Sequence, residues 1–294
     1  EPKVGKNRVL VDVHSIGLNP LDYRLRRGEM GPLVTFSKPR LIASDFSGRV
    51  LEVGPCVTDL TPGDRVCGMV NQVFTGTSAE RLSVSRANLS KSPGNVDDST
   101  AAGIPLAALT AYQALHELGD IAAGKRVLVN GASGGVGTFA TQIAKHAGAH
   151  VTAVTSYRNA DWMPEIGADE VIDYTKTDFT AGKAPYDIVF DCYGNRSFAK
   201  TKPVLSDRGI YISTIPAARN YTTTAANPFR SQKSRVVVVR SKSKDLHAIN
   251  QLIEAGALKP IIDSRFAFTE FHKAYEKLET KRAKGKIIVQ LKDG

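Results

Sequence analysis

With 294 residues, the chain is long enough for one large domain or for two domains of ordinary size. Its 42% hydrophobic and 23% charged residues are close to globular averages and exclude a disordered or fibrous chain. No apolar run reaches the roughly 18 residues that a membrane-spanning helix needs, and the three cysteines are too widely spaced for a disulfide framework or a zinc ribbon. We therefore expect a soluble protein of a reducing compartment with a sizeable core.

The net charge of +10 is concentrated in the last third of the chain. Residues 196–294 hold 20 of the 39 lysines and arginines but only 8 of the 29 aspartates and glutamates. Such a surplus can bind nucleic acid or acidic lipid, or attract phosphate-bearing cofactors and substrates. The basic residues are scattered, without an aromatic-glycine RNA-binding signature. A solvated basic face is therefore favoured over specific nucleic-acid binding.

The first 95 residues contain short strand-like segments separated by turns. Residues 9–13 alternate in polarity, residues 48–54 form a strand pattern closed by a turn, and residues 62–64 form a turn before the apolar segment 65–70. Several β segments at this spacing predict a small barrel or sandwich.

From residue 101 the pattern changes to helices that alternate with continuous apolar strands. A helical stretch over 101–118 comes first, and helices over 138–147 and around 161–166 lie between later strands. The predicted strands are 126–130, 151–155, 170–173, 187–191, 209–213 and 236–239. This alternation is typical of a parallel sheet that is covered by helices on both faces.

The end of the chain repeats the alternation more loosely. Residues 245–255 predict a helix that stops at Gly256, and Thr269 is placed to cap the last helix. Residues 286–291 predict a closing strand.

A glycine-rich turn lies between the strand that ends at Asn130 and the helix that starts near Thr138. The turn follows the pattern G-x-G-x-x-G with Ala132 at the first position. Small residues in such a turn allow the backbone to approach a pyrophosphate, and the helix start supplies N–H groups and a positive dipole end. The strand-turn-helix context predicts a dinucleotide site formed by Gly131, Ser133, Gly134, Gly135, Val136 and Gly137.

The next strand indicates which dinucleotide binds. An NAD site usually has an acidic residue at this strand end to hold the ribose 2′-hydroxyl. Here residues 151–155 are followed by Ser156 and Arg158, and no carboxylate occurs before Asp161. Ser156 and Arg158 can bind a 2′-phosphate, which favours NADPH over NADH. An ordinary exposed arginine at a helix start is the alternative for Arg158.

Eight segments together resemble the medium-chain dehydrogenase/reductase superfamily, and within it the zinc-independent quinone oxidoreductases. The segment 131–174 is especially similar to the reticulon-interacting subgroup and its bacterial and plant quinone-reductase relatives. The matching residues are 15–23, 44–50, 63–66, 101–106, 109–112, 131–137, 167–174 and 285–286.

This resemblance implies an α/β fold with a doubly wound parallel Rossmann sheet and a GroES-like β-barrel domain. We expect the barrel domain to cover residues 1–100, with 263–294 returning to it, and the NADPH domain to cover 101–262. Zinc alcohol dehydrogenases of the superfamily use a cysteine near the position of Asn19 and a histidine near Ser44, and neither is present. We therefore expect no metal.

The resemblance also assigns catalytic residues. Asn19 faces the nicotinamide and the substrate, and Asp22 and Tyr23 belong to the same segment. Tyr23 donates a hydrogen bond to the substrate carbonyl or a proton to the enolate, a role that solvent takes in many relatives. Packing against the barrel is an equal alternative for Tyr23.

Four further residues are assigned to the cofactor in the same way. Thr110 lies near the nicotinamide carboxamide, or is a hydroxyl at a helix N-terminus. Tyr174 contacts the ribose or a phosphate, and Cys192 follows a parallel strand at the edge where ligands bind. Lys286 contacts the cofactor, or is a surface lysine at a strand start.

Without a Lewis acid, simple alcohol oxidation is a poor candidate reaction. Hydride addition to a quinone or to the C=C of an α,β-unsaturated carbonyl is easier, because the charge moves to an oxygen that hydrogen bonds stabilise. One alternative is a 2-enoyl-thioester reductase, although residues 27–32 lack the tyrosine that such relatives carry there. The other is an NADPH-bound protein that binds a partner or RNA with little turnover.

Relatives commonly pair through an edge of the cofactor-domain sheet, so we expect a homodimer. The apolar strand at 236–239 would otherwise be an exposed edge. We expect a cytoplasmic protein, or a mitochondrial or plastid one if a targeting segment before Glu1 was trimmed.

Overall fold

The computed structural model describes residues 2–29, 41–71, 75–182 and 185–292. The chain divides into two compact units. The N-terminal unit comprises Glu1–Leu109, Ser241–Gly256 and Pro260–Gly294, and the Rossmann unit comprises Thr110–Arg240 and Ala257–Lys259. Among the described residues, no helix has the length and apolar character to cross a membrane.

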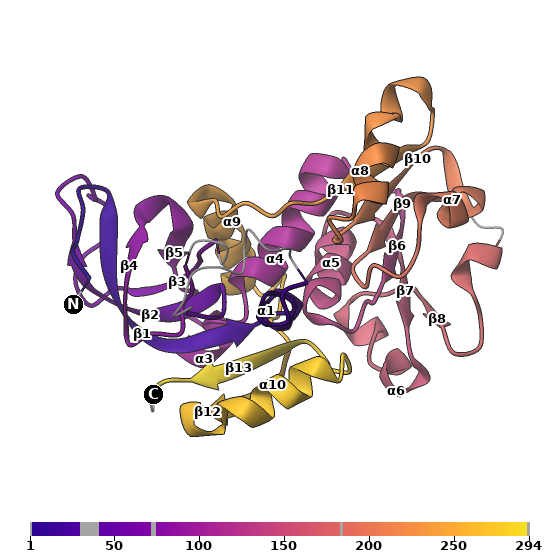
Figure 1. Ribbon diagram of the computed structural model, residues 1–294. Coiled ribbons are helices and arrows are strands. Elements are labelled where there is room, and N and C mark those ends of the chain that lie inside the picture. Colours follow the sequence, from indigo (N-terminus) through magenta and orange to yellow (C-terminus); the bar gives the residue numbers. More distant parts are fainter. Residues whose placement is uncertain (1, 30–40, 72–74, 183–184, 293–294) are drawn as a thin grey trace. The chain divides into compact units, whose positions relative to one another are not determined.

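The Rossmann unit is built on a six-stranded parallel sheet (Figure 1). Its strands are β6 (Arg126–Asn130), β7 (His150–Thr155), β8 (Glu170–Asp173), β9 (Tyr186–Asp191), β10 (Leu205–Ser213) and β11 (Lys233–Val236). The spatial order is β11-β10-β9-β6-β7-β8, and every neighbouring pair is parallel. This is the doubly wound order, whose reversal point lies between β6 and β9. The predicted Rossmann sheet is thereby confirmed.

Helices and turns connect these strands. They are α5 (Gly135–His146), α6 (Tyr157–Ala160), α7 (Phe198–Thr201) and α8 (Ala218–Ala225). A core of apolar side chains lies beside the sheet, including Leu128, Val189, Phe198 and Tyr211. The inner strands β6, β7 and β9 are buried on both faces, which explains their continuous apolar sequences.

The last predicted strand of this sheet lies three residues earlier than expected. The strongest apolar run is 236–239, but β11 pairs Lys233–Val236 with Ile210–Ser213 of β10. Val238 is 61% exposed. The prediction was wrong in register because a strand is defined by its backbone pairing, which hydropathy does not report.

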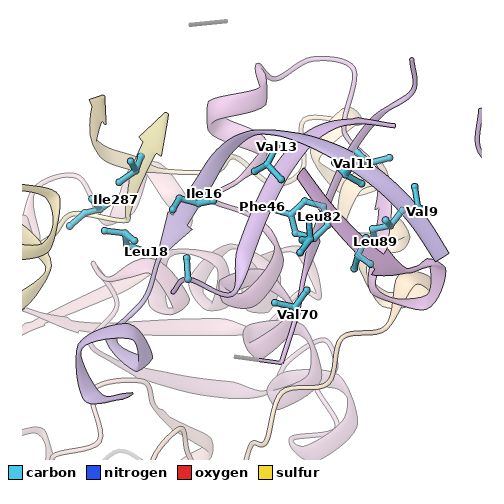
Figure 2. Packing of buried hydrophobic residues seen from close by; sticks show 14 of the residues in the cluster. Val9, Val11, Val13, Ile16, Leu18, Phe46, Val70, Leu82, Leu89 and Ile287 are labelled. Atoms are coloured by element: carbon cyan, nitrogen blue, oxygen red, sulfur yellow. The ribbon is translucent and has the colours of Figure 1, made fainter. Parts of the chain in front are cut away.

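The N-terminal unit contains a seven-stranded, largely antiparallel sheet, as expected for a GroES-like domain. Its strands are β1 (Arg8–Leu18), β2 (Asp45–Val53), β3 (Arg65–Met69), β4 (Arg81–Ser85), β5 (Leu89–Lys91), β12 (Ile262–Ala267) and β13 (Lys286–Gln290). β1 pairs with β13, β2 and β4, so the C-terminal strand returns to the first one. Figure 2 shows the core beneath β1, where Val9, Val11, Val13 and Ile16 pack near Phe46 and Leu82.

Several helices of the described residues belong wholly or partly to this unit. They are α1 (Pro20–Arg26), α3 (Asp98–Ala101), the first part of α4 (Pro105–Tyr112), α9 (Ser243–Glu254) and α10 (Phe271–Glu279). α9 ends as predicted, with Gly256 in the left-handed region just beyond it. The N-cap of α10 is Glu270 and not Thr269, because a short 3₁₀ turn over Phe268–Glu270 precedes the helix.

The unit boundaries differ from the expected domain limits mainly at α9. We expected residues 243–254 in the NADPH domain, but they cluster with the N-terminal unit. Asn250 donates to the carbonyl of Lys91 at 2.8 Å, and Glu254 accepts from the backbone N–H of Gly94 at 2.9 Å. These bonds attach α9 to the end of β5 and the turn that follows.

Candidate functional site

The carboxyl edge of the parallel sheet gathers most of the predicted cofactor residues. The glycine-rich turn follows β6, Ser156 follows β7, Tyr174 follows β8 and Cys192 follows β9. Since the carboxyl ends of parallel strands meet at one edge, these residues share the edge where ligands bind in such sheets. Residues that are far apart in the sequence are thus brought together within one unit.

The glycine-rich turn is packed so tightly that a side chain at its last position has no room. A Cβ on Gly137 would lie 2.2 Å from the Gly131 carbonyl oxygen and 2.6 Å from the Ala132 Cα. Gly134 differs, because its Cβ would meet only the Gly131 oxygen at 3.5 Å. α5 begins at Gly135, so its first N–H groups and its positive end are directed out of the turn. The cradle fits a pyrophosphate.

Ser133 connects this turn to the end of the next strand. Its Oγ accepts hydrogen bonds from Thr155 Oγ1 at 2.9 Å and from Asn159 Nδ2 at 3.1 Å. These bonds fix the turn relative to β7 and α6. Ser133 therefore helps to hold the shape of the cradle, and its predicted contact with the dinucleotide stays a prediction.

The end of β7 presents polar groups without a carboxylate. Ser156 is the N-cap residue of α6, and Arg158 lies in the first turn of that helix. The Arg158 guanidinium donates to Tyr157 Oη at 3.1 Å, and Tyr157 and Tyr174 are both more than half exposed. An accessible arginine with a serine and exposed aromatic rings fits a 2′-phosphorylated adenosine.

The sequence alone did not single out Asp191, which is fully buried at the end of β9. Its carboxylate accepts four hydrogen bonds. The donors are Asn130 Nδ2 at 2.8 Å, Gly194 N at 2.7 Å, Arg196 N at 3.1 Å and Tyr211 Oη at 3.0 Å. The only sequence signal was a carboxylate that ends an apolar strand.

Cys192 immediately follows this carboxylate. Burial, and then the negative charge of Asp191, raise the pKa of the Cys192 thiol well above its ordinary value. A thiol with a raised pKa stays protonated at neutral pH, and the predicted contact of Cys192 with the cofactor stays a prediction.

Thr110 lies inside α4 and is 5% exposed. The helix begins at Pro105, so Thr110 is in its second half. The alternative interpretation of Thr110 as a helix N-terminal hydroxyl was therefore wrong. Its predicted contact with the nicotinamide carboxamide stays a prediction.

In the N-terminal unit, Asn19 and Lys286 were predicted separately and lie in direct contact. Lys286 Nζ donates to Asn19 Oδ1 at 2.5 Å and to Asp45 Oδ2 at 3.0 Å. Asn19 Nδ2 donates to the same Asp45 oxygen at 3.0 Å. Asn19 and Lys286 are each 3% exposed and Asp45 is fully buried. Lys286 is therefore not a surface lysine, and its predicted contact with the cofactor stays a prediction.

The other two predicted catalytic residues follow Asn19 in α1. Asp22 is fully buried, and its Oδ2 accepts from the backbone N–H of Asn19 at 2.7 Å, which fixes the start of the helix. Tyr23 is 4% exposed and belongs to the apolar core, with the Arg27 guanidinium 5.5 Å from its ring centre. The packing alternative describes what Tyr23 does in the structure. Its role as a donor to the substrate stays a prediction.

Within the described ranges, no group of three or more histidine, cysteine, aspartate or glutamate side chains could hold a metal ion. The stretch 30–32, part of the comparison with enoyl-thioester reductases, lies outside the described residues.

A doubly wound sheet with a glycine-rich dinucleotide cradle, joined in one chain to an antiparallel GroES-like unit, defines a dehydrogenase or reductase of the medium-chain type. Two family profiles agree, one described as an alcohol dehydrogenase GroES-like domain over residues 5–155 and one as a zinc-binding dehydrogenase over residues 166–289. The chain belongs to the medium-chain dehydrogenase/reductase superfamily, among the quinone oxidoreductases.

Two sequence relatives and one solved structure show what the chain is similar to. It is 35% identical to the chloroplastic quinone-oxidoreductase QR1 of Triphysaria versicolor, over 98% of this chain and 91% of that protein. It is 33% identical to the chloroplastic NADPH-dependent alkenal/one oxidoreductase of Arabidopsis thaliana, over 98% of this chain and 73% of that protein. The structure of the quinone oxidoreductase from Coxiella burnetii superimposes with a TM-score of 0.90 at 29% identity, covering 99% of this chain and 92% of that one.

Proposed function

We propose that the protein is an NADPH-dependent reductase of quinones and α,β-unsaturated carbonyls. The observation that carries the cofactor assignment is the carboxyl edge of the Rossmann sheet. There the cradle at Gly131–Gly137 is followed, at the end of β7, by Ser156 and an accessible Arg158 in place of an acidic residue. The acceptor class is supported by relatives named for quinones and for alkenals and enones.

Bound NADPH supplies the hydride for this reaction. In the proposal, the N–H groups at the start of α5 bind the pyrophosphate, and Ser156 and Arg158 bind the 2′-phosphate. Asn19 orients the acceptor. The hydride adds to the quinone or to the β-carbon, the negative charge moves to the carbonyl oxygen, and one proton from solvent completes the hydroquinone or the saturated ketone.

The test is NADPH and NADH oxidation by the purified protein, followed at the nicotinamide absorbance. The acceptors are 9,10-phenanthrenequinone, an alkenal and a crotonyl thioester, each with and without a chelator. We expect chelator-insensitive turnover that prefers NADPH and the first two acceptors. Turnover on the thioester alone would replace the proposal with an enoyl-thioester reductase. Tight NADPH binding without any turnover, together with salt-sensitive RNA retention, would favour a binding protein.

We further propose that two copies of the chain pair through β11. Within the described residues, β11 is hydrogen-bonded to β10 on one side only. The segment after it exposes apolar surface, with Val238 61% exposed beside a hollow that Gln113, Glu117 and Leu118 help to line. A free strand edge beside exposed apolar side chains is a template for strand addition.

The oligomeric state can be measured by sedimentation equilibrium. We expect a dimer for the natural chain and a monomer for Val238→Lys, which places a charge on the edge. A monomeric natural chain would contradict the pairing.

The compartment is proposed to be an organelle and not the cytoplasm, which is supported by the chloroplastic names of both plant relatives. Localisation of the tagged full-length protein tests this.

A further inference from the structure

Lys286 is the first residue of β13, and its ammonium group is buried where three segments meet. Its Nζ donates to the Leu18 carbonyl at 3.0 Å, where β1 ends. It also donates to Asn19 Oδ1 at 2.5 Å and to Asp45 Oδ2 at 3.0 Å, where β2 begins. An ammonium group has three N–H donors. All three therefore have acceptors inside the N-terminal unit, and a new partner could bind only by displacing one.

Asp45 is equally well satisfied. One carboxylate oxygen accepts from Lys286 and from Asn19, and the other accepts from the backbone N–H of Leu106 at 2.7 Å. Burying an ammonium and a carboxylate is costly, and the cost is offset only where the charges are paired and their hydrogen bonds are complete. Asp45 and Lys286 meet both conditions.

The ion pair fixes the orientation of the Asn19 amide. The amide nitrogen donates to Asp45 Oδ2 and, at 3.3 Å, to the Gly17 carbonyl, while the amide oxygen accepts from Lys286. A flipped amide would place its NH₂ group against the ammonium and its oxygen against the carboxylate. The chemistry of the two neighbours therefore permits one orientation. The Asn19 backbone N–H is held as well, by Asp22.

We propose that Lys286 and Asp45 are positioning residues that hold the Asn19 amide in one orientation for hydride transfer, and that Lys286 does not bind the cofactor directly. This inference rests on the proposed function, in which Asn19 orients the acceptor. Lys286 acts through its bond to Asn19 Oδ1. A misplaced Asn19 changes the distance between hydride donor and acceptor without removing any bond to the NADPH phosphates.

The main test variant is Lys286→Met, which keeps most of the length of the side chain and removes the charge. We expect the NADPH dissociation constant, measured by fluorescence titration, to stay within about threefold of the natural value. We expect kcat to fall about 10- to 100-fold, the cost of a misplacement of roughly 1 Å. The primary isotope effect with C4-deuterated NADPH should rise, because hydride transfer becomes slower. Asn19→Ala should reproduce this pattern, and the double variant should be no worse than either single one.

Two further variants keep the test decisive. Lys286→Met leaves the Asp45 charge unpaired, so the double variant Lys286→Met/Asp45→Asn, which removes both charges, serves if the single variant does not fold. It should show the same loss of kcat. Lys277→Met is the matched control, since it removes a lysine of the same unit whose side chain is 42% exposed and pairs with Asp263 at 3.1 Å. It should leave kcat and the isotope effect unchanged.

The outcomes separate the possible roles. A rise of more than tenfold in the NADPH dissociation constant with unchanged kcat would assign Lys286 to the cofactor and overturn the proposal. A lower melting temperature with unchanged kcat would leave only a structural role and would also overturn it. The side-chain amide NMR signals of Asn19 give a readout that needs no turnover. They should be slow to exchange with solvent and should lose this protection in Lys286→Met. If the Asn19 amide signals keep their protection in Lys286→Met, the proposal fails, even when the natural protein is an active reductase. If the natural protein turns over no acceptor, only the proposed function is contradicted.

Discussion

The Asp191 carboxylate and the Tyr211 hydroxyl are hydrogen-bonded at 3.0 Å in the interior of the Rossmann unit, joining the ends of β9 and β10. The same hydroxyl lies 2.9 Å from the carbonyl of Arg196, so Tyr211 bridges β9 and the segment that follows it. Burial, and then the charge of Asp191, raise the pKa of Tyr211 above its ordinary value, which keeps the phenol protonated as a donor. This buried network shapes the segment 192–196 at the edge where we place the cofactor.

Removal of the Tyr211 hydroxyl should destabilise the protein by about 1–2 kcal/mol, because a buried carboxylate loses one of its donors. Asp191→Ala should cost more, about 3–5 kcal/mol, since four donors lose their acceptor. Urea unfolding of Tyr211→Phe and Asp191→Ala measures both. Tyr221→Phe is the control, because Tyr221 is 47% exposed, and its change should stay within about 0.5 kcal/mol. Equal effects at Tyr211 and Tyr221 would contradict the importance of the network.

Two glycines of the cradle should respond differently to alanine. Gly137→Ala places a Cβ 2.2 Å from a backbone oxygen, so the turn must open. The protein should be destabilised by about 1–3 kcal/mol. Gly134→Ala meets only an ordinary contact at 3.5 Å and should leave the melting temperature unchanged. Its methyl group should nevertheless obstruct the pyrophosphate. Thermal melting and NADPH titration of both variants make the comparison.

Loss of NADPH affinity in Gly134→Ala without loss of stability would place the pyrophosphate at this turn. Unchanged affinity in a stable Gly134→Ala variant would instead show that the cofactor does not approach the turn closely, and would contradict the cradle.

Most of the Rossmann unit could be predicted because its signals are local. The glycine-rich turn, the strand before it and the helix after it occupy consecutive residues, and each strand is a continuous apolar run. At residues 233–239 strand pairing and hydropathy disagree, and the strand predicted from the apolar run lies three residues after the observed one. The N-cap of α10 was missed for a similar reason, since a 3₁₀ turn begins before the helix and uses Thr269 within it.

The polar clusters could not be predicted because they depend on contacts between distant residues. Lys286 and Asn19 are 267 positions apart, and each was predicted to have a separate role. Asp191 and Tyr211 lie on neighbouring strands whose pairing brings the side chains together. A buried aspartate looks the same in a sequence as an exposed one, so its four hydrogen bonds become visible only in the folded chain.

Arg158→Ala should reduce the preference for NADPH. If the guanidinium binds the 2′-phosphate, its removal should weaken NADPH binding about tenfold and leave NADH binding unchanged, because NADH has no phosphate at that position. Titration of both cofactors measures the ratio. Lys200→Ala removes another exposed positive charge from the same unit and should lower both affinities equally or not at all. An equal loss of both cofactors in Arg158→Ala would assign the arginine a general electrostatic role.

The buried Cys67 thiol should make the protein less stable at alkaline pH. Burial raises the pKa of Cys67 from its ordinary value of 9.0 to about 11, although Asn250 and Ser92 lower it slightly by hydrogen bonding. The folded state therefore keeps a proton that the unfolded chain loses above pH 9. This contribution is fully present below pH 9 and is lost as the pH rises through 11, a change of about 3 kcal/mol at 1.36 kcal/mol per pKa unit. In urea unfolding from pH 8 to 11, the free energy of unfolding should fall more steeply for the natural chain than for Cys67→Ala. Cys56→Ala alters an exposed thiol and should follow the natural chain. Parallel curves for all three proteins would mean that the Cys67 thiol titrates alike in the folded and unfolded states.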